Sequence, residues 1–65
     1  MNMVYIHFNA DGTIRLACLR VNGEKVKDMD QWEVWDFYQF LLTLGRKPIE
    51  VTYPGDGTTI HMITY

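Results

Sequence analysis

The sequence has little of what would fix a small domain covalently or carry it into a membrane. It contains a single cysteine, Cys18, so no internal disulfide can form, which excludes a disulfide-linked secreted scaffold. No apolar run approaches the roughly 20 residues that cross a bilayer, and the first residues lack the pattern of a signal peptide. We therefore expect a soluble, cytoplasmic protein.

Positive charge is also scarce. Six Lys and Arg residues stand against eight Asp and Glu residues, which gives a formal net charge of −2 and an isoelectric point near 5.4. Binding driven by nucleic-acid phosphates needs an excess of cations, so this balance argues against a nucleic-acid partner. Linkers, repeats and low-complexity segments are absent as well, and we expect one domain over residues 1–65.

Large side chains, by contrast, are abundant. The chain has two Trp, four Tyr, three Phe and four Met, and 48% of its residues are hydrophobic. A domain of this length buries only about 60% of the surface that its unfolded chain exposes. The free energy gained by burying apolar surface and the conformational entropy lost on folding then nearly cancel. We therefore expect an efficient aromatic core or a partner, for which a second copy of the chain is a candidate.

The first 18 residues predict a β-hairpin. Apolar residues alternate over 3–8, and Asn9-Ala10-Asp11-Gly12 is typical of a type I turn followed by a bulge. This turn predicts three cross-strand pairs that share the core face: Phe8–Ile14, Ile6–Leu16 and Val4–Cys18. A shift of one residue would scatter these apolar side chains over both faces, so turn and pattern agree on the register.

A second turn follows the second strand. If that strand runs to Val21, Asn22-Gly23 forms a two-residue turn that pairs Leu19 with Val26. The returning segment, 24–27, is short and charged, as edge strands often are.

The middle of the chain predicts a helix over 31–44. Asp30 is a good N-cap, and Glu33 three residues later fits a capping box. Gly45 is typical of the position just past a helix, and Pro48 prevents continuation.

The remaining residues predict a second hairpin, with strands over 49–53 and 58–65 around the turn Pro54-Gly55-Asp56-Gly57. The expected pairs, again facing the core, are Tyr53–Thr58, Val51–Ile60 and Ile49–Met62. The fold class is α+β with a ββαββ order: two antiparallel hairpins form a sheet and one helix packs across one face. The order of strands between the hairpins is left open.

The predicted helix is more hydrophobic than packing on one sheet face requires. The side chains expected to face the sheet are Val34, Phe37, Tyr38, Leu41 and Leu44. Trp32 falls on the solvent side and Trp35 and Phe40 on the shoulders, so the apolar arc covers about 220°. Either sheet twist and loops cover these shoulders, or the three aromatic residues contact a partner.

The sheet face away from the helix is expected to mix aromatic, aliphatic and polar residues. Those predicted on it are Met3, Tyr5, His7, Arg15, Ala17 and Leu19 from the first hairpin, and Glu50, Thr52, Thr59, His61, Ile63 and Tyr65 from the second. Such a face suits a binding surface, with Tyr5 and Tyr65 as its aromatic contacts. It also suits an ordinary half-exposed antiparallel sheet.

Four carboxylates surround the helix start: Asp28, Asp30, Glu33 and Asp36. Capping and attraction to the positive end of the helix dipole account for such a group. The alternative is an electronegative patch that imitates a nucleic-acid backbone toward a basic partner.

The histidines are predicted to make cross-strand pairs, His7 with Arg15 and His61 with Glu50. A metal site needs three or four converging ligands, and Cys18 is expected on the opposite face, so we predict no metal and no cofactor. Glu50 and His61 lack a nucleophile and an oxyanion-binding group, so we do not expect an enzyme.

A hairpin closed by Asp11-Gly12, followed by a helix that opens Trp32-Glu33-Val34-Trp35, resembles the small phage inhibitors of uracil-DNA glycosylase. That family places an aromatic–Glu–Val stretch on a helix behind a hairpin and dimerises through sheet and helix. The resemblance covers about half of the chain, and the final hairpin departs from it.

We therefore expect a non-enzymatic protein-binding module, a phage-type inhibitor or modulator of a host enzyme, that also forms a homodimer. The residues expected to bind the partner are Trp32, Trp35, Phe40, Tyr5 and Tyr65. The alternative is a nucleic-acid-binding or regulatory domain that uses Tyr5, Arg15, Tyr65 and the histidines on the open face.

Overall fold

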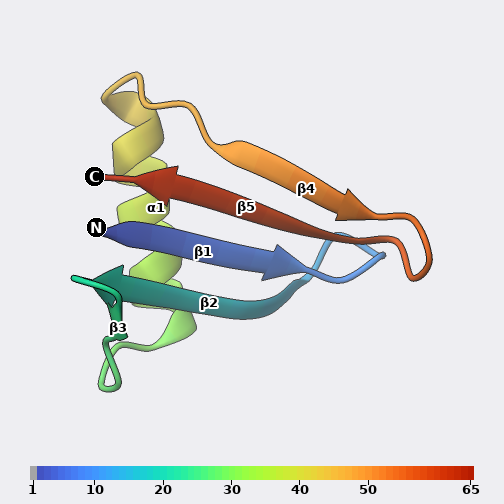
Figure 1. Ribbon diagram of the computed structural model, residues 1–65, viewed down its shortest axis with the longest axis horizontal. Helices are drawn as coiled ribbons and strands as arrows, with labels where there is room; N and C mark the ends of the chain where they lie inside the picture. The colour runs from blue at the N-terminus through green and yellow to red at the C-terminus, as the bar shows by residue number, and fades with distance from the viewer. Residues whose placement is uncertain (1) are drawn as a thin grey trace.

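One helix lies across one face of an antiparallel sheet in the computed structural model, which describes residues 2–65 (Figure 1). The elements are β1 (Met3–Phe8), β2 (Ile14–Val21), β3 (Glu24–Lys25), α1 (Gln31–Thr43), β4 (Ile49–Tyr53) and β5 (Thr58–Thr64). The five strands have the order β3-β2-β1-β5-β4. The predicted α+β class and ββαββ arrangement are confirmed.

The two hairpins join through the antiparallel pairing of β1 with β5, which the sequence left open. Val4 lies opposite Ile63, and Ile6 lies opposite His61. The first and last long strands are thus the centre of the sheet, and β3 and β4 form its edges. Over residues 2–65 no helix combines the length and apolar character that crossing a bilayer requires.

The turn between β1 and β2 has the predicted conformation. The Gly12 amide donates to the Asn9 carbonyl at 3.0 Å, and Gly12 adopts a φ of 87°, which a side chain would strain. The Asp11 carboxylate accepts bonds from the hydroxyl and amide of Thr13, which hold the pKa of Asp11 below its usual range. Asp56 makes the same pair of bonds to Thr58 in the turn between β4 and β5.

The predicted register of the first hairpin is correct at the turn and wrong beyond it. Phe8 pairs with Ile14, as expected, but His7 pairs with Leu16, so Arg15 has no partner across the ladder. This β-bulge inserts one residue into β2 and moves every later side chain to the other face.

The shifted pairs are Ile6–Ala17 and Val4–Leu19, in place of Ile6–Leu16 and Val4–Cys18. Ala17 is buried in the core and Leu19 packs against it, although both were expected on the open face. Cys18, expected in the core, lies on the open face opposite Tyr5.

The second hairpin has the predicted pairs but the opposite orientation. Val51 pairs with Ile60 and Ile49 with Met62, yet these residues face away from the helix. Ile63, from the alternate set, is buried in the core beside Val4. Because β5 is apolar on both faces, its own alternation cannot choose a side, and pairing with β1 decides it.

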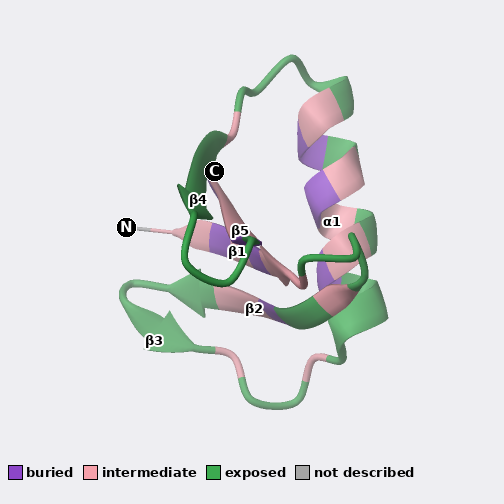
Figure 2. Ribbon diagram, turned by 90° about the vertical axis from the view of Figure 1, so that its right-hand side faces the viewer, coloured by how far each residue is buried: buried purple, intermediate pink, exposed green. Residues whose placement is uncertain are grey.

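The core lies between α1 and the centre of the sheet (Figure 2). Its buried members are Val4, Ile6, Ala17, Val34, Tyr38, Leu41 and Ile63. Leu44, expected to face the sheet, is exposed because the helix ends at Thr43 and Leu44 is its C-cap.

Asp30 and Gly45 cap the two helix ends as the sequence indicates, and the capping box with Glu33 stays a prediction. One carboxylate oxygen of Asp30 accepts bonds from the amides of Trp32 at 2.7 Å and Glu33 at 3.0 Å. At the other end the Gly45 amide donates to Leu42, and the next amide, of Arg46, donates to Leu41. These two bonds form a Schellman motif, which requires the positive φ of 84° at Gly45.

The second turn also has its expected form. Asn22 and Gly23 both have positive φ, and the Val26 amide donates to the Leu19 carbonyl at 2.9 Å. The returning strand is shorter than predicted, because β3 comprises only Glu24 and Lys25.

The cap predicts a stability loss for Asp30→Ala. Removing the acceptor of two helix amides should lower the free energy of unfolding by about 1 kcal/mol without changing the fold. Urea melts followed by circular dichroism measure this, with Asp28→Ala as a control carboxylate outside the cap. A loss below about 0.3 kcal/mol would remove Asp30 from this role.

Candidate interaction surfaces

The outer side of α1 exposes large apolar side chains. Trp32 is 60% exposed, Phe40 54% and Leu44 59%. At 100° per residue, these three lie within an arc of about 120° on the side away from the core. We name them the outer helix surface. Sheet twist and loops therefore do not cover Trp32 and Phe40.

Trp35 occupies a different place, between the helix and the sheet. Its ring stacks on Tyr38 with 5.7 Å between centroids, and it meets Phe8 edge to face at 6.0 Å. Trp35 is therefore partly buried against the core, although the sequence groups it with Trp32 and Phe40. Its role in partner binding stays a prediction.

The two tyrosines predicted to share the open face lie on opposite faces of the sheet. Tyr65 meets Phe37 of the helix edge to face at 4.9 Å, and burial raises the pKa of its hydroxyl. Tyr5 lies on the open face, where the Arg20 guanidinium stands 5.9 Å from the centre of its ring. The five predicted partner-binding residues thus do not form one surface.

The open face has a shallow cavity of about 490 Å³. Its lining residues are Tyr5, His7, Leu16, Cys18, Arg20, Gly23 and Ile60. This cavity does not follow from the sequence pattern, because the bulge at Arg15 brings Leu16 and Cys18 to this side. His7 was expected to face Arg15, but it pairs with Leu16, and its buried Nε2 atom has no hydrogen-bond partner among the described residues.

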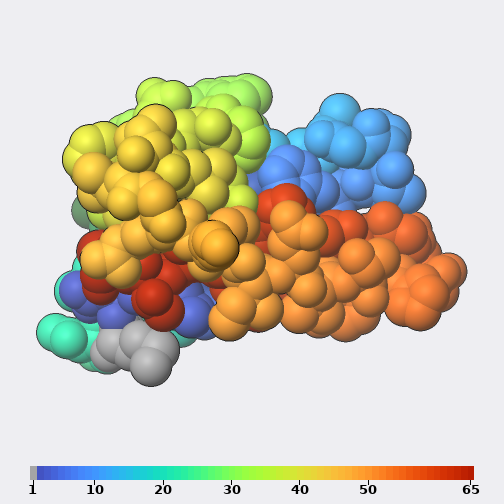
Figure 3. Space-filling view, turned by 90° about the horizontal axis from the view of Figure 1, so that it is seen from above, coloured from blue at the N-terminus to red at the C-terminus, as the bar shows by residue number. Residues whose placement is uncertain are grey.

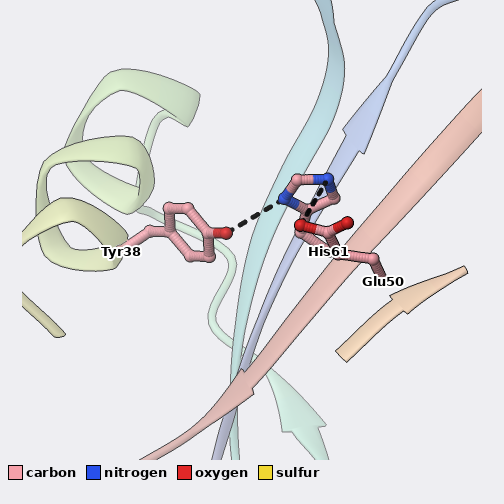
Figure 4. A network of polar contacts seen from close by, with 3 residues as sticks. All are labelled: Tyr38, Glu50 and His61. Atoms are coloured by element: carbon pink, nitrogen blue, oxygen red, sulfur yellow. Dashed lines mark hydrogen bonds and ion pairs between the residues drawn. The ribbon is translucent and has the colours of Figure 1, made fainter. Parts of the chain in front are cut away.

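His61 faces the helix and joins three elements (Figure 4). The Tyr38 hydroxyl lies 3.0 Å from His61 Nδ1, and His61 Nε2 lies 3.8 Å from a carboxylate oxygen of Glu50. The predicted Glu50–His61 pair is confirmed, but on the helix side and not on the open face. In the tautomer that has Nδ1 as acceptor, the Nε2 atom is the donor and points toward Glu50.

This network fastens β4 and β5 to the helix. Burial raises the pKa of Tyr38, and the nearby negative charge of Glu50 raises it further by a smaller amount. The phenol therefore stays protonated and donates to His61. Tyr38 is itself buried, and its hydroxyl joins the helix to β5 through His61.

The carboxylates at the helix start are all exposed. Asp30 is engaged in capping, and the structure shows no ion pair between Glu33 or Asp36 and a basic side chain of residues 2–65. Across the same residues, no three His, Cys, Asp or Glu side chains gather closely enough to hold a metal ion.

Comparison with known proteins adds no relative. Neither a scan against protein-family models nor searches of curated proteins and solved structures found a match for this chain.

The Tyr38–His61 contact predicts the response of stability to alkaline pH. Tyr38→Phe should lower the free energy of unfolding by about 1 kcal/mol at pH 7, because the bond is lost and His61 keeps an unpaired nitrogen. The pKa of Tyr38 is higher in the folded chain than its ordinary value of about 10. Its contribution is therefore complete below pH 10 and lost as pH rises through the folded pKa.

Tyr38→Phe should therefore lose less stability above pH 10 than the parent. The pKa of Tyr65 is also raised, so Tyr65 should cause the loss of stability that remains in this variant. Urea melts at pH 7 and between pH 9 and 11 measure both effects. Tyr53→Phe, at an exposed tyrosine, is the control. An unchanged alkaline slope in Tyr38→Phe would contradict this account.

Proposed function

We propose that this chain is a non-enzymatic protein-binding module whose outer helix surface contacts the partner. The observation that supports this proposal is the exposure of Trp32 and Phe40 on one side of a 13-residue helix, together with Leu44 at its C-cap. Scattered apolar residues are normal on a protein surface. Two aromatic residues and a leucine lie within one arc, with Asp36 between Trp32 and Phe40, and a groove on another protein can accept such a surface.

The energetics favour Trp32 as the central contact. Tryptophan is the residue type most enriched among binding hot spots, where truncation costs about 2 kcal/mol or more. Trp32 also contributes little to the core, since most of its side chain is exposed. The rings of Phe40 and Phe37 are nearly parallel, with 6.4 Å between their centroids. This contact partly fixes the position of Phe40 before binding.

Charge indicates the chemistry of the partner. Glu33 and Asp36 lie beside Trp32 on the helix and are exposed without a basic partner among the described residues. An acidic rim around an aromatic centre is complementary to an apolar groove bordered by Lys or Arg. We therefore propose a partner with a basic-rimmed apolar groove.

The biological form that we propose is inhibition or modulation of a host enzyme, of the kind that phages encode. A 65-residue module that fills a groove on an enzyme blocks whatever else must bind there. We propose that it acts in the cytoplasm, where the lone Cys18 stays reduced.

Trp32→Ala is the variant that tests this surface. The isolated protein should unfold within about 0.5 kcal/mol of the parent, because the side chain is mostly exposed. Capture of the partner should weaken by at least about 30-fold, the equivalent of 2 kcal/mol. The measurement is quantitative mass spectrometry of proteins captured from a lysate of the source cells by immobilised parent and variant, followed by titration of the captured protein.

Leu16→Ala is the matched control, an exposed apolar residue on the opposite sheet face. It should capture the same protein as the parent. Glu33→Gln should weaken capture and reduce its dependence on salt. Equal capture by parent and Trp32→Ala, or equal loss in Trp32→Ala and Leu16→Ala, would exclude the outer helix surface as the binding site.

A further inference from the structure

The edge strand β4 is unusually open. All five of its residues are exposed, although Ile49, Val51 and Tyr53 are large and apolar, with exposures of 59%, 37% and 46%. Among residues 2–65, no strand pairs with its far side. Figure 3 looks onto this edge and shows the orange atoms of β4 and its turn uncovered at the surface. The main contacts of α1 are with β2 and β1, so the helix does not shield β4.

The two edges of the sheet differ in how they resist pairing. At the other edge, β3 comprises two charged residues, Glu24 and Lys25, which is a common protection against pairing. β4 is longer, with five residues, and has one charged residue, Glu50; it contains no Lys or Pro, and its five pairs with β5 run without a bulge. A regular apolar edge with unpaired backbone groups is a template for another strand.

The sequence of β4 is complementary to itself. In an antiparallel pair centred on Val51, all five residues overlap, Ile49 lies opposite Tyr53 of the second copy, and Val51 lies opposite its own equivalent. Glu50 then faces Thr52, so no like charges oppose each other. Centring on Glu50 would oppose two carboxylates, and centring on Thr52 would place Glu50 against Pro54, which has no amide to donate.

We infer that β4 pairs antiparallel with β4 of a second copy of this chain, centred on Val51. A two-fold axis perpendicular to the sheet relates the copies, so the sheets become continuous and both helices lie on the same face. The apolar row of β4 then runs across the junction. This inference goes beyond the proposed function, because it uses the edge strand and leaves the outer helix surface free for the other partner.

Light scattering and sedimentation equilibrium over a concentration series test the pairing. The parent should reach twice the 7.7 kDa mass of one chain. Val51→Lys should weaken dimerisation at least tenfold, because two ammonium groups would meet at the centre. Val21→Lys is the matched control, since Val21 is a valine of similar exposure, 39%, outside β4. It should dimerise like the parent.

Disulfide trapping tests the register of the β4–β4 pair, and its result does not depend on whether Val51→Lys folds. In a Cys18→Ala background, Val51→Cys should form a covalent dimer under mild oxidation, since directly opposed residues lie about 4.5–5.5 Å apart. Thr52→Cys should form much less, because Thr52 faces Glu50 and its own equivalent is diagonal, about 7–8 Å away.

A parent that stays monomeric at all concentrations would overturn the inference. Equal trapping of the two cysteine variants would do the same, as would unchanged dimerisation in Val51→Lys. Loss of the dimer in Leu16→Lys, on the open face away from β4, would replace edge pairing with packing of two open faces. Trp32→Ala should leave the dimer intact, so failure of the proposed function and failure of this inference are distinguishable.

Discussion

The structure depends on one limitation: a single helix must cover a sheet that is larger than the helix. An α-helix is about 10 Å in diameter, and α1 runs across the strands near one end of the sheet (Figure 1). Beneath it Val4, Ile6 and Ile63 are almost completely buried against Val34. β4 lies beyond the helix and is exposed along its whole length, and its apolar side chains lie on the sheet face away from the helix. Among residues 2–65 no second layer covers that face.

Polar contacts compensate where apolar cover is thin. The helix reaches β5 through the Tyr38–His61 hydrogen bond, and His61 continues to Glu50 on the edge strand. Such a bond contributes about 1 kcal/mol, which is a large fraction of the stability expected for so short a chain. The outer helix surface belongs to α1 and its C-cap, whereas the proposed pairing edge belongs to β4. We therefore propose different partners for the two surfaces.

The positions of the candidate binding residues were only partly predictable from the sequence. Trp32 and Phe40 follow from helical periodicity, because a residue far from the centre of the apolar arc has no sheet to meet. Trp35 lies on the shoulder of the same arc, and only the positions of Tyr38 and Phe8 show that its ring is held between the layers. Tyr65 was placed on the wrong face because β5 is apolar on both sides.

The sequence by itself determined the local elements: the turns at Gly12 and Gly23, the cap at Asp30 and the helix end at Gly45. These depend on backbone conformation and hydrogen bonds between residues a few positions apart, which local residue types encode. The tertiary structure decided which strands are neighbours and which faces turn inward. A bulge at Arg15 reverses Leu16 and Cys18, and the pairing of β5 with β1 buries Ile63 in place of Ile60. A strand with apolar residues on both faces has two nearly equivalent orientations, and only long-range packing against the helix separates them.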